Sequence, residues 1–320
     1  MKSSFAVSEK NYKSALQKQV LPYFYQGDQR TFINPEGMKL NFHSFLSSQN
    51  KKTIVILPGR SEPALKYAEL VYDLKDSGYN IYVLDHQGQG ASERHLKDTH
   101  KGHVKVFVNY VRDFSKWLDE VVIPETRNQE RFLVAHSMGA VVGSVYLAYG
   151  KETFKKAVFS APMMELNTKP YKEDVARVLS GTLTLARLGS NYAPDRGPYL
   201  ASNDTFEKNE VTHSKARFEM AKEIFVKNPE LAVGGPTNRW VHQSLITTKR
   251  FDTIAEKIKI PVLMFQAGLD LIVKPGRQNA FCEKGPGCTM IRFPDAHHEI
   301  LQETDAIRNK ALDSLKNYIK

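Results

Sequence analysis

Six short runs of apolar residues, rich in Val and Ile, place the strongest constraint on the fold of this 320-residue chain. Each run is continuously apolar instead of alternating with polar residues, which is typical of parallel strands covered on both faces. Longer segments with helical spacing of apolar residues separate most of the runs. The pattern therefore predicts a parallel α/β sheet. The expected strands are residues 53–59, 80–86, 131–137, 156–163, 260–268 and 288–294.

Two more strands are expected ahead of these, at 23–33 and 38–48, because the turn-forming residues 34–37 (Asn-Pro-Glu-Gly) lie between them. They should pair antiparallel at the edge, which gives a mostly parallel sheet of about eight strands with helices on both faces. The expected helices are residues 63–77, 104–123, 138–150 and 303–319.

Almost a hundred residues without a convincing strand separate the strands 156–163 and 260–268. Three helix-like stretches fill this interval, so we expect an inserted helical cap that covers the sheet as a lid. The predicted layout is an N-terminal segment at 1–22, a core formed by 23–163 and 251–320, and a cap at 164–250.

Composition excludes several classes of protein. Hydrophobic residues make up 41% of the chain and only two cysteines are present, so neither a disordered chain nor a disulfide scaffold is expected. No run of about 18 apolar residues could form a membrane-spanning helix. The N-terminus carries charges where a secretory signal needs apolar residues, so we expect a cytoplasmic protein. Cys282 and Cys288 flank a turn and could pair, but free thiols are expected in that compartment.

The chain is basic, with 45 Lys and Arg against 35 Asp and Glu and a formal net charge of +10. Such an excess can serve nucleic acid, an anionic membrane surface or an anionic substrate. Because the basic residues are scattered and no aromatic-interleaved basic motif is present, no nucleic-acid partner is expected. Peripheral contact with the inner face of the cytoplasmic membrane is an alternative to a freely soluble enzyme, and the sequence leaves the oligomeric state open.

Ser137 is the candidate nucleophile. It stands at the corner between the strand 131–137 and the apolar helix 138–150, with Ala135 and Gly139 two residues away on either side. Small residues are needed there because the corner strains the backbone of the serine. The corner pushes the hydroxyl out of the sheet, and the free N–H groups of the helix point at an oxyanion. A serine that merely caps the helix is the alternative.

A serine nucleophile requires a histidine that accepts its proton and a carboxylate that orients the histidine. In α/β-hydrolases the acid and then the histidine follow two late strands. Asp270 follows the strand 260–268, and both His297 and His298 follow the strand 288–294. Asp295 is the less favoured acid because it lies too close in sequence to these histidines. The residues alone leave the choice between the two histidines open.

Motifs spread over residues 25–318 carry a family resemblance. They include LPGRSEPALKYAEL, DHQGQGASER, AHSMGA, GGPTNRWVHQSL, FQAGLDLIV and AHHEIL. Together they resemble the bacterial lysophospholipase branch of the monoacylglycerol-lipase-like α/β-hydrolases. In that family the last motif looks like A-Y-H-E-I, so the resemblance implies that His298 is catalytic and that His297 replaces an aromatic neighbour. The acid of the family falls on Asp270.

The resemblance implies a serine hydrolase that cleaves the acyl ester of a lysophospholipid into a fatty acid and a glycerophospho-alcohol. The backbone N–H groups of Met138 and Arg60 would stabilise the oxyanion, although Pro58 departs from the His-Gly-x that such relatives usually carry. We further expect the Arg60 side chain to attract the phosphodiester. The residues expected to contact the lipid are Arg60, His136, Met163, Leu183 and Leu185, although an apolar helical stripe is equally consistent with plain helix core.

Several other functions are alternatives to a lysophospholipase. A monoacylglycerol lipase or a general carboxylesterase would share the triad, and a proline-iminopeptidase-like peptidase would need a carboxylate cluster in the cap. A non-enzymatic binding protein would be expected to have lost a triad residue. The loop at 88–93 lacks the third glycine of a dinucleotide fingerprint, and the histidines at 86–103 lack metal-ligand spacing. Neither a cofactor nor a metal is therefore expected.

Overall fold

Eight strands form a single sheet in the order β1-β2-β4-β3-β5-β6-β7-β8 in this computed structural model, which describes residues 7–249 and 251–320. The strands β3 to β8 are parallel, and the hairpin β1–β2 adds antiparallel to β4. The predicted fold class is thereby confirmed. The strands are β1 (Asp28–Ile33), β2 (Lys39–Phe45), β3 (Lys52–Leu57), β4 (Tyr79–Leu84), β5 (Glu130–His136), β6 (Lys156–Ser160), β7 (Val262–Ala267) and β8 (Cys288–Phe293).

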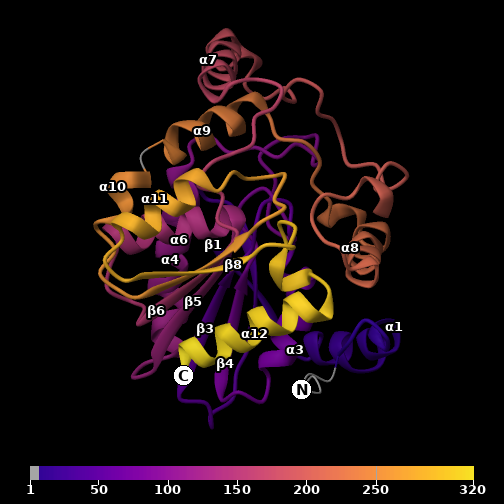
Figure 1. Cartoon of the computed structure of the whole chain (residues 1–320), viewed down its shortest axis with the longest axis vertical. Coiled ribbons are helices and arrows are strands. Elements are labelled where there is room, and N and C mark those ends of the chain that lie inside the picture. Colours follow the sequence, from indigo (N-terminus) through magenta and orange to yellow (C-terminus); the bar gives the residue numbers. More distant parts are fainter. Residues whose placement is uncertain (1–6, 250) are drawn as a thin grey trace.

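Helices cover both faces of the sheet because successive residues of each buried strand point to opposite sides. Ile54 and Ile56 of β3 pack with α3 (Ala68–Leu74) and α12 (Asp305–Ile319), and α12 crosses the front of the strands in Figure 1. Val55 and Leu57 face the other core. That core holds α4 (Val108–Trp117), α6 (Ser137–Tyr149), α10 (Phe251–Ala255) and α11 (Gly276–Lys284).

The N-terminal segment differs from the prediction that a strand begins at residue 23. Residues 12–24 are helical, as α1 (Tyr12–Ala15), a π-helical turn over Leu16–Val20 and α2 (Leu21–Phe24). The buried residues Tyr12, Leu16, Val20 and Phe24 recur every fourth position, which is the spacing of one helix face. The first strand therefore begins at Asp28. The first six residues of the predicted segment 1–22 lie outside the described residues.

The two cysteines also differ from the prediction. Cys282 at the end of α11 and Cys288 at the start of β8 are joined in a disulfide, whereas free thiols were expected from the presumed compartment. The turn between them brings their α-carbons to 4.9 Å, a separation that a disulfide spans readily.

Between β6 and β7 the described residues form helices and irregular loops without a strand of the sheet. The main helices are α7 (Glu173–Leu183), α8 (Lys215–Lys227) and α9 (Asn238–Thr248). Figure 1 shows α7 and α9 above the sheet and α8 to one side of it. Arg217 of α8 is fully buried and pairs with Glu69 of α3 at 2.9 Å, so α8 is tied to the core. Within the described part of the chain, no helix is sufficiently long and apolar to cross a bilayer.

Candidate active site

Ser137 lies at a strained corner between β5 and α6. Its φ of 48° falls in the left-handed region that non-glycine residues rarely adopt. The corner is tight, because a β-carbon on Gly139 would lie only 2.5 Å from the carbonyl oxygen of Pro58. The requirement for a glycine two residues after the serine is therefore steric. The backbone holds the Ser137 side chain at the carboxyl edge of the sheet, at the first residue of α6.

A chain of two hydrogen bonds links Ser137, His298 and Asp270. The Ser137 Oγ lies 2.9 Å from His298 Nε2, and His298 Nδ1 lies 2.7 Å from Asp270 Oδ2. The other Asp270 oxygen accepts the N–H groups of Ile272 and Val273, both at 2.9 Å. Burial alone would raise the pKa of Asp270, but the His298 ring and these hydrogen bonds lower it. Asp270 is thus held ionised beside the imidazole, as the acid of a triad must be.

The two rival residues take other positions. The His297 ring packs against His213, with 3.8 Å between the ring centroids, and its backbone N–H donates to Glu303 at 2.8 Å. Asp295 is exposed. The structure therefore brings His298 and Asp270, and not His297 or Asp295, to Ser137.

The two predicted oxyanion donors belong to different elements, and Arg60 lines the same cavity as Ser137. Met138 is in the first turn of α6, where an N–H group has no intrahelical acceptor. Arg60 follows Gly59 in the loop after β3, and the Gly59 N–H donates to Glu62 Oε2 at 2.6 Å. A hydrogen bond to a buried carboxylate therefore fixes the loop that carries the Arg60 amide.

Glu62 belongs to a buried charge network that the sequence analysis missed. Lys66 Nζ lies 2.9 Å from Glu62 and 2.5 Å from Glu299, the residue after His298, and the Tyr67 hydroxyl donates to Glu62 at 2.6 Å. Burial opposes the charge of Lys66, but the two carboxylates raise its pKa above the usual range. Burial likewise opposes ionisation of Glu62, whose pKa is nevertheless lowered by Lys66 and His136. The network links the loop after β3, which carries Arg60, to the loop after β8, which carries His298. The i, i+4 spacing of Glu62 and Lys66, directly after a predicted strand, was the available signal.

His136 packs against His298 of the candidate triad. Its Nδ1 is 3.0 Å from the Ser160 carbonyl oxygen, and its ring centroid is 4.8 Å from that of His298. Burial lowers the pKa of His136 to about 4, so the ring is neutral at physiological pH. A neutral ring there adds no positive charge that would compete with protonation of His298.

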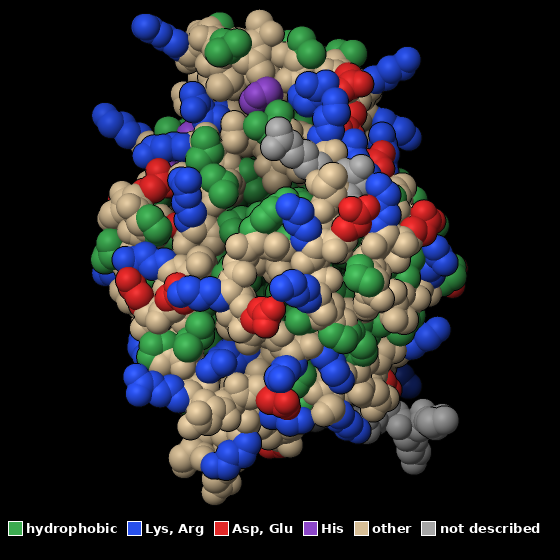
Figure 2. Space-filling view, turned by 90° about the vertical axis from the view of Figure 1, so that its left-hand side faces the viewer, with side chains coloured by type: hydrophobic (Ala, Val, Ile, Leu, Met, Phe, Trp, Pro, Cys, Tyr) green, Lys and Arg blue, Asp and Glu red, His purple; other side chains and the backbone are tan. Residues whose placement is uncertain are grey.

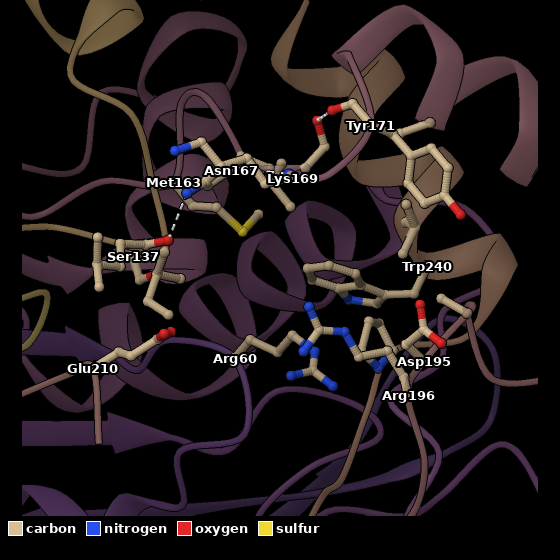
Figure 3. A pocket seen from close by; sticks show the side chains of 18 of the residues that line it. Arg60, Ser137, Met163, Asn167, Lys169, Tyr171, Asp195, Arg196, Glu210 and Trp240 are labelled. Carbon is tan, nitrogen blue, oxygen red and sulfur yellow. Dashed lines mark hydrogen bonds between the residues drawn. The ribbon is translucent and has the colours of Figure 1, made fainter. Parts of the chain in front are cut away.

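The candidate triad opens into a cavity of about 510 Å³ beneath the helical insertion. Figure 3 shows Ser137 and Met163 on one side of this cavity and Trp240 on another, with Arg60 extending between them. The volume falls within the usual range for small-molecule sites. Within the described residues, no group of three or more His, Cys, Asp or Glu side chains is arranged to hold a metal ion.

Three of the five residues expected to contact a lipid line this cavity, namely Arg60, His136 and Met163. Leu183 and Leu185 do not. The cavity meets α7 at Ala176, Leu179 and Ser180, one turn before Leu183, and Leu185 projects into solvent with 87% of its surface exposed. The expectation failed because helical periodicity identifies an apolar face but not how far along the helix that face is covered.

Known proteins resemble this chain along most of its length. The profile of the Hydrolase_4 family, described as serine aminopeptidase, S33, matches residues 48–305. A Haemophilus influenzae protein named "Probable lysophospholipase L2" is 32% identical over 304 residues, covering 94% of this chain and 95% of that protein. Lysophospholipase L2 of Escherichia coli K12 is 30% identical over 303 residues, covering 92% and 88% respectively. A soluble variant of monoglyceride lipase from Saccharomyces cerevisiae shares the fold, with a TM-score of 0.73 at 16% identity over 92% of this chain and 94% of that chain.

Proposed function

Because this chain belongs to the Hydrolase_4 family and is an ester hydrolase with the α/β-hydrolase fold, we propose that it cleaves the acyl ester of lysophospholipids. The products are a fatty acid and a glycerophospho-alcohol. The hydrogen-bonded chain from Ser137 through His298 to Asp270, open to a 510 Å³ cavity, is the observation that carries this proposal. The names of the two lysophospholipase relatives support the choice of substrate.

Acylation starts from the hydrogen bond between Ser137 and His298. The Ser137 Oγ attacks the acyl carbonyl carbon while His298 Nε2 takes its proton, and Asp270 stabilises the resulting imidazolium. The N–H groups of Met138 and Arg60 stabilise the negative oxygen of the tetrahedral intermediate. His298 then gives its proton to the departing glycerol oxygen, which breaks the ester bond and leaves the acyl group on Ser137.

Deacylation repeats these steps with water as the nucleophile. His298 takes a proton from the water, the hydroxide attacks the acyl-enzyme, and the proton returns to the Ser137 Oγ as the fatty acid leaves. Deacylation thus returns Ser137, His298 and Asp270 to their starting charges.

The insertion at 164–250 acts in this proposal as a cap that binds the acyl chain. Its residues Leu166, Leu179 and Trp240 line the cavity together with Met163 from the loop after β6. A peptidase that binds a free amino terminus would need carboxylates there with free charge. Glu62 and Glu299, which also line the cavity, both pair with Lys66, whereas Asp195 and Glu210 line it as well, so the substrate test below includes a peptidase substrate.

The test is fatty-acid release from lysophosphatidylcholine, lysophosphatidylethanolamine and monoacylglycerol by wild type and Ser137→Ala. We expect Ser137-dependent release that favours both lysophospholipids. A preference for monoacylglycerol would instead identify a monoacylglycerol lipase or carboxylesterase. Activity that survives in Ser137→Ala would overturn the triad assignment, and Ser137-dependent cleavage of prolyl-p-nitroanilide without ester cleavage would identify a peptidase.

A further inference from the structure

The Arg60 side chain is held in a fixed position along the cavity wall. Its Nη2 donates a hydrogen bond to the carbonyl oxygen of Gly234, and its guanidinium lies 5.2 Å from the centre of the Trp240 ring. Gly102 permits this position, because a β-carbon there would lie 2.7 Å from Nη2. Three separate elements therefore meet around one cation beside the candidate nucleophile. A surface arginine without a role would not need such support, since it loses side-chain entropy when it is fixed.

The cation has no counter-charge from the protein. Within the described residues, no ion pair joins Arg60 to a carboxylate, and its Nε is buried without a hydrogen-bond partner. Instead the guanidinium of Arg196 lies near enough to act on Arg60 electrostatically, and Figure 3 shows the two side chains together below Trp240. Burial lowers the pKa of Arg60 to about 10 and Arg196 contributes in the same direction, yet Arg60 remains protonated at neutral pH.

The carboxylates that face the cavity do not cancel this charge. Glu62 and Glu299 both pair with Lys66, and among the described residues neither forms an ion pair with Arg60. Asp195 and Glu210 also line the cavity, but neither forms an ion pair with either arginine among the described residues. A buried charge without a partner is unfavourable, so the arrangement favours an anionic ligand that supplies the missing charge.

The position of this cation relative to the nucleophile suits one ligand chemistry. The Arg60 backbone N–H is the proposed oxyanion donor, so its guanidinium lies one arginine side chain away from the reacting carbonyl. The same number of covalent bonds separates the backbone nitrogen of an arginine from its guanidinium carbon as separates the acyl carbon of a 1-acyl lysophospholipid from its phosphorus. Guanidinium groups bind phosphate oxygens with paired hydrogen bonds.

We propose that Arg60 and Arg196 form the subsite for the phosphodiester of the substrate, and that this pair determines the preference for lysophospholipids over neutral monoacylglycerols. The inference rests on the proposed function, because it assigns to the same cavity the part of the lipid that the triad does not touch. Arg60 supplies the fixed cation, and the exposed Arg196 supplies a second cation at the cavity mouth.

The experiment compares two uncleavable ethers of the same chain length, an alkyl-glycerophosphocholine and an alkylglycerol. Each is used below its critical micelle concentration as a competitive inhibitor of p-nitrophenyl butyrate hydrolysis. The variants are Arg196→Gln, Arg60→Gln and the control Arg127→Gln, which removes the same charge from an exposed loop before β5. Arg196 is exposed, so its variant is expected to fold even if Arg60→Gln does not.

We expect Arg196→Gln and Arg60→Gln each to raise the Ki of the phosphocholine ether about tenfold or more relative to that of the alkylglycerol, as for a lost charge-assisted hydrogen bond. Arg127→Gln should leave the ratio as in wild type. An unchanged ratio in Arg196→Gln would overturn the proposal. It would also be overturned if inorganic phosphate inhibited as strongly as the phosphocholine ether and if the variants raised both Ki values equally. The ethers are not hydrolysed, so this result is separate from the failure of the proposed function, which would appear as absent fatty-acid release from lysophospholipids by wild type.

Discussion

Gly139 is the residue on which the geometry of the corner at Ser137 depends most directly. A β-carbon there would meet the backbone oxygens of Leu57, the last residue of β3, and of Pro58, the latter at 2.5 Å, and the Leu57 oxygen cannot move aside without displacing β3. A β-carbon on Gly143, one turn later in α6, would meet Leu133 Cδ2 at 2.9 Å, which is the end of a flexible side chain. We therefore expect Gly139→Ala to lower the free energy of unfolding by about 3 kcal/mol or more, as overpacking does. Gly143→Ala should cost less, because alanine gains about 1 kcal/mol of helix propensity. Urea unfolding of both variants tests this, and equal losses would contradict it.

Glu62 is expected to position the loop after β3, which carries the Arg60 amide, without touching the substrate carbonyl. Its carboxylate accepts the Gly59 N–H, so Glu62→Gln weakens the contact that fixes the Arg60 amide. We expect kcat to fall about tenfold with a smaller change in KM, because an oxyanion donor acts mainly in the transition state. Glu299→Gln is the matched control, since Glu299 shares Lys66 but does not contact Gly59, and its kcat should fall less. A larger fall in Glu299→Gln would mean that the charge balance around Lys66 matters more than the loop.

At the scale of single residues, the sequence predicts those whose chemistry requires particular neighbouring elements in the chain. Ser137 was predictable because a strand, a corner and a helix surround it in sequence, and Asp270 because it follows a late strand. The choice of His298 over His297 came from the family resemblance, since two adjacent histidines have the same local context. For Lys66 the sequence offers one partner, Glu62 four residues before it, but the second partner, Glu299, meets it only in the folded chain, so its burial was not predictable.

At the scale of elements, α4 is linked to two loops by one buried carboxyl group. Asp113 of α4 accepts hydrogen bonds from Asn34 in the β1–β2 turn and from Gln87 in the loop after β4. Burial raises the pKa of Asp113 from its ordinary value of 3.8 to about 7, although these two hydrogen bonds oppose the change. The folded state therefore binds this proton more tightly than the unfolded chain does.

The sign of the resulting pH dependence follows from this difference. The contribution of Asp113 to stability is complete below about pH 4 and is lost as the pH rises to about 7. We expect the unfolding free energy of wild type to fall over this window relative to Asp113→Asn, by up to about 4 kcal/mol. Denaturant unfolding at several pH values measures it. The exposed Asp28→Asn serves as the control, and a difference between wild type and Asp113→Asn that is constant with pH would contradict the assignment.

Elements were predicted best where burial is uniform. The six parallel strands appear in the sequence as continuous apolar runs because helices cover both sheet faces. The end of the helical segment at 12–24 was missed because Tyr23, Phe24 and Tyr25 favour a strand, although Gln26 and Gly27 separate them from the strand that begins at Asp28. The helices α7, α8 and α9 were predicted from period alone, but the burial of α8 against the core depends on the pair between Arg217 and Glu69, which lie 148 residues apart.

At the scale of the whole molecule, the cavity joins parts of the chain that no local pattern connects. Arg60 follows β3, Arg196 lies in the insertion, and Trp240 belongs to α9, yet the three surround one space. Arg60 was predictable because the family resemblance implies that its backbone N–H is the second oxyanion donor, next to the nucleophile. Arg196 and Trp240 were not, since their meeting with Arg60 depends on how the insertion packs on the sheet.

The outer surface of the insertion combines exposed apolar side chains with an overall positive charge. Val175 and Val178 of α7 are 50% and 61% exposed, and Leu185 beyond it is 87% exposed. The chain carries a net charge of +10, and Figure 2 shows Lys and Arg spread over the face in view. Leu179 of the same helix lines the cavity. A lipid surface that met α7 would therefore lie close to the cavity mouth.

We predict that the protein binds vesicles that contain phosphatidylglycerol more strongly than vesicles of phosphatidylcholine alone. Each basic residue near an anionic surface contributes about 1 kcal/mol, and salt screens this attraction over about 10 Å at 0.1 M. Co-sedimentation should accordingly fall as salt rises. Leu185→Ser should weaken binding at every salt concentration, because it removes apolar contact and leaves the charge unchanged. Tyr149→Ser removes an exposed apolar group at the far end of α6 from Ser137 and should have no such effect. Equal binding to both vesicle types would show that anionic lipid does not attract the protein. Equal vesicle binding by the two variants would show that α7 and Leu185 do not contact the lipid.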